Sequence, residues 1–134
     1  MGALIGTSGA GKTAYVTRQD CADTAAGALA STETANTIID VSGPEAIGYE
    51  KVAAVLSEIS NKKIPYIDMP DSDFKAALTK SGLPEAWADV YVAFDLSSRQ
   101  GALGATTNAV EKYAGHKPQS LQVFLQESKA ALLR

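Results

Sequence analysis

Residues 6–13 contain three glycines and end in Gly-Lys-Thr. They fit the phosphate-binding pattern G-x-x-x-x-G-K-[S/T], in which backbone amides and a lysine surround the phosphates of a nucleotide. Such a loop needs a buried strand before it and a helix that begins at the Gly-Lys-Thr itself. Whether a helix follows Lys12 therefore decides which folds and functions are open to the chain.

The residues after Lys12 favour a strand, because they are mostly aromatic or β-branched up to Thr17. A helix signal arrives only at Thr17, which has capping-box spacing with Asp20. We therefore predict a turn between two short strands at residues 3–5 and 14–17. The nucleotide-binding interpretation, a small P-loop NTPase or kinase, is disfavoured.

Length and composition set further bounds. A chain of 134 residues is one domain by length, and 46% hydrophobic with 20% charged residues is typical of a folded protein. A net charge of −3 argues against nucleic acid as a partner. No apolar run approaches the ~20 residues of a membrane span, and no secretory signal is present, so we expect no membrane association and a cytoplasmic location.

Cysteine and histidine are each represented once, by Cys21 and His116. One cysteine cannot form an intrachain disulfide, and one histidine excludes multi-histidine metal sites. We expect no metal site and no catalytic residue in this chain.

Periodicity and turn signals predict two more strands and a series of helices. The strands are placed at residues 37–41 and 63–69; the helices at about 18–31, 49–60, 71–82, from Pro84, at 108–115 and from Ser120. The predicted class is α/β (α+β), with a small mixed sheet of three to four short strands and five or six helices. Such a small sheet leaves apolar surface of the helices uncovered, so we expect the chain to be an incomplete part of a larger fold.

The helix that follows Pro84 carries most of the large aromatic surface of the chain. Trp87, Val90, Tyr91 and Phe94 share one face at helical spacing. A buried core seam is the favoured interpretation, because helical spacing indicates burial and not a ligand. The alternative is the wall of a ligand pocket, with Trp87, Tyr91 and Phe94 as substrate-pocket candidates.

Several segments, taken in order, resemble the C-terminal half of NmrA-like proteins. These are the atypical short-chain dehydrogenases/reductases that include bacterial NAD(P)H:quinone oxidoreductases. The matching segments are residues 2–6 with Gly9 and Gly11, 15–22, 40–46 with Tyr49 and Val52, 64–66, 73–74, 76–78, 82–84, 106–111, 115–118, 120–121 and 124–125. The resemblance spans essentially all 134 residues.

The resemblance implies a substrate-side half whose N-terminal Rossmann half is missing. Family members bind NAD(P)H through that half, whereas the spacing of Gly6, Gly9 and Gly11 is not a dinucleotide fingerprint. We therefore expect no cofactor on this chain and no hydride transfer by it alone. No catalytic residue of the family can be carried across, and Tyr15 is the weakest of the pocket candidates.

Two functions remain open beside the NTPase. The first is a truncated or separately encoded substrate-domain portion of an NAD(P)H-dependent quinone oxidoreductase-like protein. The second is a stand-alone small-ligand-binding or regulatory NmrA-like module. The second predicts a small aromatic ligand. The first predicts no dinucleotide binding by the chain alone and either a homo-oligomer or assembly with the missing Rossmann half, because an apolar face would otherwise be exposed.

Overall fold

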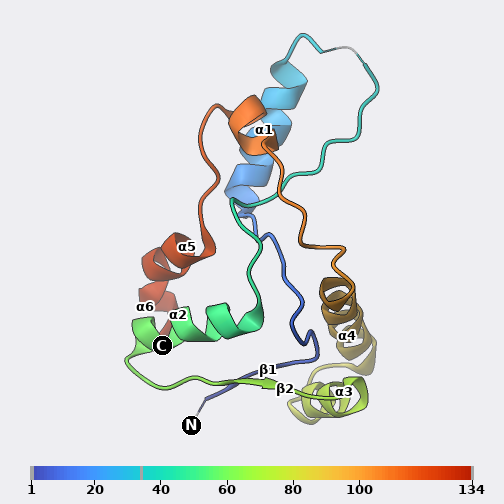
Figure 1. Cartoon of the computed structure of the whole chain (residues 1–134), viewed down its shortest axis with the longest axis vertical. Helices are drawn as coiled ribbons and strands as arrows, with labels where there is room; N and C mark the ends of the chain where they lie inside the picture. The colour runs from blue at the N-terminus through green and yellow to red at the C-terminus, as the bar shows by residue number, and fades with distance from the viewer. Residues whose placement is uncertain (1, 34, 134) are drawn as a thin grey trace. The chain divides into compact units, whose positions relative to one another are not determined.

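The computed structural model describes residues 2–33 and 35–133, which form two compact units. The first unit takes the chain up to Thr13 together with Ile47–Gly104. The second takes Ala14–Ala46 and the chain from Ala105 onward. Figure 1 colours the chain by residue number, so the segments of each unit can be found with its colour bar.

The first unit is built on a two-stranded parallel sheet. Strand β1 (Leu4–Gly6) pairs with β2 (Tyr66–Asp68), with Ile5 opposite Ile67. Figure 1 shows the two strands side by side. The strand that leads into the glycine segment therefore pairs with β2 and does not form the predicted hairpin with residues 14–17.

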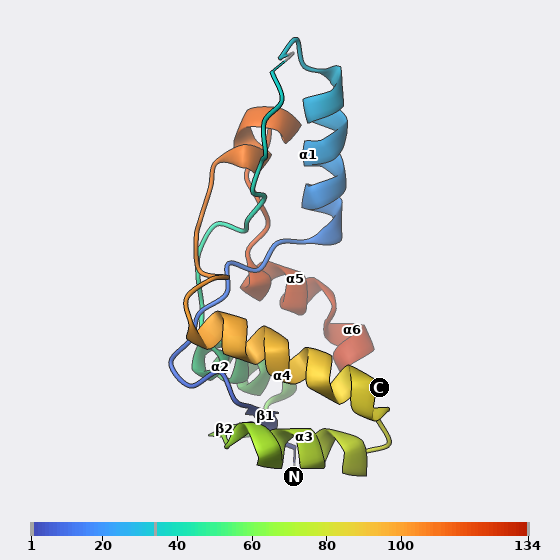
Figure 2. The ribbon, with the colours of Figure 1, turned by 90° about the vertical axis from the view of Figure 1, so that its right-hand side faces the viewer.

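Three helices accompany this sheet. Helix α2 (Tyr49–Ser60) has the predicted bounds, and its C-cap residue Asn61 has a left-handed φ of 52°. Helices α3 (Asp71–Lys80) and α4 (Glu85–Arg99) pack against each other, as Figure 2 shows. The buried hydrophobic residues of the unit come from these helices: Ala53, Val55, Ile59, Phe74 and Ala88.

The second unit is helical. Helix α1 (Arg18–Ala30) packs against the short π-helix η1 (Val110–Ala114), and α5 (Leu121–Glu127) and α6 (Lys129–Leu132) follow. The Thr17 hydroxyl accepts the Asp20 N–H at 3.0 Å, so the predicted cap of α1 is confirmed. Ser120 likewise caps α5, through the Val123 N–H.

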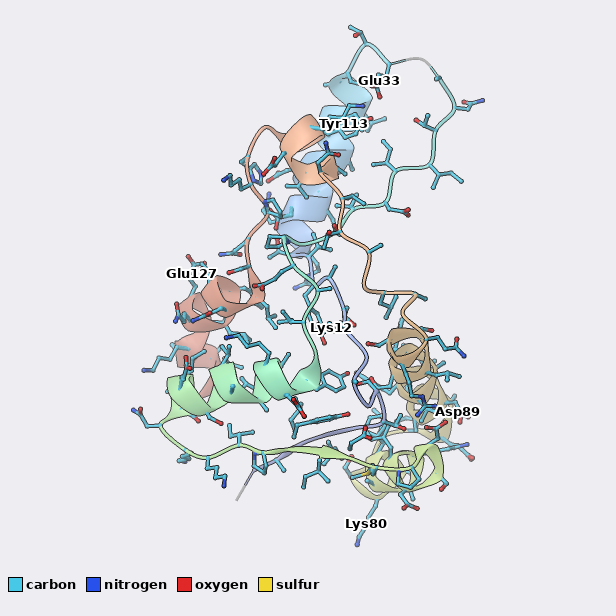
Figure 3. The ribbon with its side chains drawn as sticks, viewed as in Figure 1. Lys12, Glu33, Lys80, Asp89, Tyr113 and Glu127 are labelled. Carbon is cyan, nitrogen blue, oxygen red and sulfur yellow. The ribbon has the colours of Figure 1, made fainter. Side chains whose placement is uncertain are left out.

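A polar cluster joins the segment after α1 to η1. The Tyr113 hydroxyl donates to Glu33 Oε2 at 2.6 Å, and the Lys112 ammonium lies 2.6 Å from Glu33 Oε1. These contacts hold the pKa of Glu33 below its usual value, first through Lys112 and then through Tyr113. Figure 3 shows Glu33 and Tyr113 approaching each other from the end of α1 and from η1.

The predicted α/β class is confirmed, but two predicted strands are wrong. Within the described residues, only β1 and β2 form a sheet, so three to four strands was too many. Residues 14–17 and 37–41 carry no strand, because neither segment has a ladder partner. The helix predicted at residues 108–115 is the shorter π-helix η1, which begins after Ala109 with no side-chain cap.

A close backbone contact between α1 and η1 generates the first prediction. A Cβ on Gly27 would lie 1.8 Å from the Tyr113 carbonyl oxygen. Alanine normally stabilises a helix interior by up to ~1 kcal/mol over glycine. Here we expect Gly27→Ala to destabilise the second unit by about 2 kcal/mol, because overpacking forces the backbones apart.

The measurement is urea unfolding followed by circular dichroism. Gly2→Ala is the control, because a Cβ there meets nothing within 4 Å. A stabilised Gly27→Ala variant would contradict the described contact between α1 and η1.

Candidate functional site

The glycine segment continues into extended backbone. Thr13 and Ile47 exchange two backbone hydrogen bonds of 3.0 Å in an isolated antiparallel bridge. The next helix, α1, begins only at Arg18. The prediction that no helix rises from the Gly-Lys-Thr is therefore confirmed.

Backbone N–H groups of this segment already donate hydrogen bonds to carboxylates of the chain itself. The Thr7 N–H donates to Asp95 Oδ2 at 2.8 Å, and the Gly9 N–H donates to Asp68 Oδ1 at 2.9 Å. Asp95 is 4% exposed. A phosphate group could use these amides only by displacing carboxylates that already satisfy them.

The glycines themselves have packing roles. A Cβ on Gly11 would lie 2.6 Å from the Ser98 carbonyl carbon, and one on Gly6 would lie 2.8 Å from the Tyr49 ring. The spacing that imitates a nucleotide loop therefore reflects the close approach of this segment to α4 and α2.

Arg99 links the glycine segment to a third carboxylate, that of Asp71. Its guanidinium donates to both Asp71 oxygens, at 3.0 and 3.1 Å, and to the Thr7 carbonyl at 2.8 Å. The hydrogen bond from Arg99 holds the pKa of Asp71 below its usual value, and a second one from the Thr7 hydroxyl adds to this. With three carboxylates gathered around it, the segment does not fit a dinucleotide pyrophosphate.

One cavity, of about 520 Å³, lies entirely within the second unit. Two aromatic rings, Tyr15 and Phe124, contribute to its walls, and Gln19, Gln119 and Arg18 supply polar groups. Its lining is Tyr15, Val16, Thr17, Arg18, Gln19, Gln119, Leu121 and Phe124. An apolar wall with a few polar groups is the usual character of a small-molecule site.

A second cavity, of about 580 Å³, lies within the first unit beside the glycine segment. Lys12 (labelled in Figure 3) and Lys51 line it together with the rings of Tyr49 and Tyr66, whose centroids are 5.4 Å apart. Burial raises the pKa of Tyr66, whose hydroxyl donates to Asp68. This cavity mixes charges of both signs and has less apolar wall.

The four predicted pocket residues are not brought together. Tyr15 lines the cavity of the second unit. Trp87, Tyr91 and Phe94 lie on α4 in the first unit with exposed fractions of 59%, 49% and 59%, and they line neither cavity described above. Their role as a pocket wall stays a prediction.

The favoured interpretation of the aromatic stripe as a core seam is wrong. Helix α4 buries Ala88, Asp95 and Ser98 instead. Small and polar residues face inward because the Gly11 backbone touches α4 at Ser98, and because Asp95 must reach the Thr7 amide. No room is left on that side for large rings.

Sequence reasoning missed most of the cavity in the second unit. Gln19, Gln119 and Phe124 are not among the candidates that the sequence suggests, although all three line the cavity. Residues 15–19 and 119–124 stand about a hundred positions apart, so no local pattern could have joined them. Their proximity follows only from the fold of the unit.

A charged cluster ties these two stretches together. Asp20, 4% exposed, accepts the Gln119 N–H at 3.1 Å. The His116 imidazole contacts the Lys117 carbonyl through Nδ1 at 3.0 Å and Asp23 Oδ2 through Nε2 at 3.3 Å. The Lys117 carbonyl and then Asp23 raise the pKa of His116 above its ordinary value.

None of the helices in residues 2–33 and 35–133 is long and apolar enough to cross a bilayer. The same residues contain no group of three or more His, Cys, Asp or Glu side chains placed to hold a metal ion.

No protein-family model matches the chain, but individual proteins do. It is 32% identical over 120 residues to quinone oxidoreductase 2 of Escherichia coli, over 90% of this chain and 42% of that protein. It is 27% identical over 123 residues to an uncharacterized oxidoreductase of Bacillus subtilis, over 92% of this chain and 43% of the relative.

A solved structure shows the same partial similarity. An NADPH-dependent quinone oxidoreductase from Escherichia coli, complexed with NADPH, matches with a TM-score of 0.86 and 30% identity over 98% of this chain and 45% of that one. The chain spans less than half the length of these relatives. The expected resemblance to NmrA-like oxidoreductases, and the expected incompleteness of the fold, are confirmed.

The buried carboxylate of Asp95 generates the second prediction. We expect Asp95→Ala to destabilise the first unit by about 3 kcal/mol, because the Thr7 N–H and the Tyr49 hydroxyl would lose a charged acceptor. Asp89→Ala, on the same helix, is the control; Asp89 is exposed and pairs with Lys75, so its loss should cost no more than about 1 kcal/mol. Equal urea midpoints for the two variants would contradict this role.

His116 generates the third prediction. The pKa of His116 is raised in the folded chain. Its contribution to the stability of the fold is therefore fully present below about pH 6.5, and it is lost as the pH rises through the pKa of the folded state. The second unit should therefore melt at a lower temperature at pH 8 than at pH 6. His116→Gln should remove this part of the pH dependence, and Lys129→Gln should leave it unchanged. Parallel melting curves for the unaltered chain and His116→Gln at both pH values would refute the cluster.

Proposed function

We propose that this chain, a homologue of the NmrA-like NAD(P)H quinone oxidoreductases, is the substrate-side portion of such a protein. The observation that carries the proposal is the aromatic cavity of the second unit, formed around Tyr15 and Phe124. In this proposal the cavity holds a planar aromatic substrate. NAD(P)H binds to a portion that the chain does not span.

The lining of the cavity suits a quinone. Aromatic rings favour stacking against a flat conjugated ligand. Gln19 and Gln119 each use one side-chain N–H within the unit, to Asp23 and Glu127 respectively. A side-chain amide has two such donors, so each retains one for a carbonyl oxygen. The cavity volume of about 520 Å³ is ordinary for a small-molecule site.

Hydride transfer is assigned to the assembled protein and not to this chain alone. Transfer requires a bound dinucleotide, and the glycine segment donates its Thr7 and Gly9 amides to Asp95 and Asp68 instead. Supporting this assignment, the chain matches only 42% of the Escherichia coli enzyme.

A stand-alone binding or regulatory module is the second candidate. What favours it is that the cavity is lined wholly by residues of one unit, so a ligand could bind without a partner. Against it stands the exposed aromatic face of α4, formed by Trp87, Tyr91 and Phe94. A patch of this kind commonly marks an interaction surface. A partner half is therefore the better proposal.

Quinone binding provides the fourth prediction. Calorimetric titration of the chain with menadione should give measurable binding, which Tyr15→Ala weakens about tenfold because one stacking wall is lost. Tyr15→Phe keeps the ring and should bind nearly as well as the unaltered chain. Trp87→Ala, on exposed α4, should have no effect.

Other results would redirect the assignment. Weaker binding by Trp87→Ala would place the ligand on α4, and indifference of the unaltered chain to menadione would remove the cavity as a quinone site. NADPH and Mg²⁺-ATP should give no binding heat in the same instrument. Tight ATP binding that Lys12→Ala abolishes would restore the NTPase.

A further inference from the structure

The cavity beside the glycine segment carries charged groups that the proposed function does not use. All of its lining residues belong to the first unit. Its volume of about 580 Å³ lies in the usual range for a small-molecule site. Two ammonium groups, two carboxylates and two aromatic rings meet there. The side chains that supply them are Lys12, Lys51, Glu50, Asp68, Tyr49 and Tyr66.

The positive charges of this cavity have no internal partner. Neither Lys12 nor Lys51 forms an ion pair with a carboxylate of residues 2–33 and 35–133, and both side chains are exposed. The N-terminus of α2 lines the cavity as well, and its N-cap Gly48 makes no side-chain hydrogen bond. The first amide groups of a helix lack intrahelical acceptors and favour an anion. This wall of the cavity therefore suits a carboxylate.

The opposite charge comes chiefly from Asp68, which uses only one of its two oxygens. Asp68 Oδ1 accepts the Gly9 N–H at 2.9 Å and the Tyr66 hydroxyl at 2.7 Å. Asp68 Oδ2 accepts no hydrogen bond from the described part of the chain. Glu50, in the first turn of α2, is exposed and also has no ion pair among those residues. Such oxygens are good acceptors for an ammonium group.

Two tyrosine rings form the aromatic part of the wall. Tyr49 and Tyr66 are half-buried and meet edge to face, with their centroids 5.4 Å apart. Their hydroxyls are held by the carboxylates of Asp95 and Asp68, each at 2.7 Å, so the rings keep a fixed orientation. Aromatic rings attract both cations and other aromatic rings.

We infer that this cavity binds a zwitterion, namely a free α-amino acid with an aromatic side chain. The carboxylate of the ligand lies against the ammonium groups of Lys12 and Lys51. Its ammonium group lies against Asp68 Oδ2, and its ring packs on Tyr49 and Tyr66. The inference does not rest on the proposed function, because the quinone cavity is lined by residues of the second unit.

A ligand with a single kind of charge is the less suitable occupant. A nucleotide phosphate would bring several negative charges to a cavity that already holds the carboxylates of Glu50 and Asp68, and like charges repel. A plain amine would bring a positive charge to Lys12 and Lys51. A ligand that carries both charges matches both walls.

Three ligands that differ by one charged group test the inference. L-Phenylalanine, 3-phenylpropionate (which lacks the ammonium group) and phenethylamine (which lacks the carboxylate) are titrated separately into the full chain at pH 7. Calorimetry measures the affinity, and the NMR shifts of the Gly9 and Glu50 amides locate the ligand. We expect phenylalanine to bind at least about tenfold more tightly than either analogue, because each analogue leaves one charged wall unmatched.

Matched variants assign the charges. Lys12→Gln should weaken phenylalanine binding at least about tenfold, whereas Lys80→Gln, at the end of α3 and outside the cavity, should leave it unchanged. Figure 3 labels both lysines. Asp68→Asn keeps an oxygen for the Gly9 N–H and the Tyr66 hydroxyl. It should weaken phenylalanine binding about tenfold without weakening that of 3-phenylpropionate, which also shows that the variant is folded.

Every other result overturns the inference. Equal affinities for phenylalanine and 3-phenylpropionate would make the cavity an anion site, and equal affinities for phenylalanine and phenethylamine would make it a cation site. Shifts confined to residues 15–19 and 119–124 would place the amino acid in the second unit. Absence of phenylalanine binding would leave the cavity without this role. The proposed function is tested separately, by menadione and the Tyr15→Ala variant.

Discussion

The Asp95 carboxylate, buried on α4, fixes the shape of the first unit. It accepts hydrogen bonds from the Thr7 N–H at 2.8 Å and from the Tyr49 hydroxyl at 2.7 Å, so it joins the glycine segment to both α4 and α2. A buried carboxylate is tolerated only when such donors surround it. The requirement explains two features together. The glycine segment must lie close to both helices, and its amides are consequently not directed at an external anion.

Local signals in the sequence predicted the helices well. The Thr17 cap and the periodicity of residues 49–60 placed α1 and α2 correctly, because helix formation depends on neighbours three and four residues apart. The same kind of periodicity led to the wrong prediction that the aromatic stripe of α4 is buried. Spacing shows that one face is apolar, but whether the fold covers that face depends on distant contacts such as the one between Gly11 and Ser98.

Strand prediction failed for a different physical reason. The preference of Val, Ile and Thr for strands measures how well they fit a sheet, and the preference has no effect where no sheet edge is present. Residues 3–5 found β2 as a partner, with the strand extending to Gly6, whereas residues 14–17 and 37–41 found none within the described chain. The cavity around Tyr15 and Phe124 was equally out of reach, since its two halves meet only through the fold of the second unit.

Apolar side chains and polar side chains of the chain differ in how far the fold satisfies them. Among the described residues, no buried side-chain nitrogen or oxygen lacks a hydrogen-bond partner. Large apolar side chains, in contrast, are widely exposed, from Ile38 to Trp87 and Phe94. Polar groups are costly to leave unsatisfied inside a protein, whereas exposed apolar surface only forgoes stabilisation. A partner would therefore add hydrophobic contacts to each unit without having to reorganise the polar networks that already shape it.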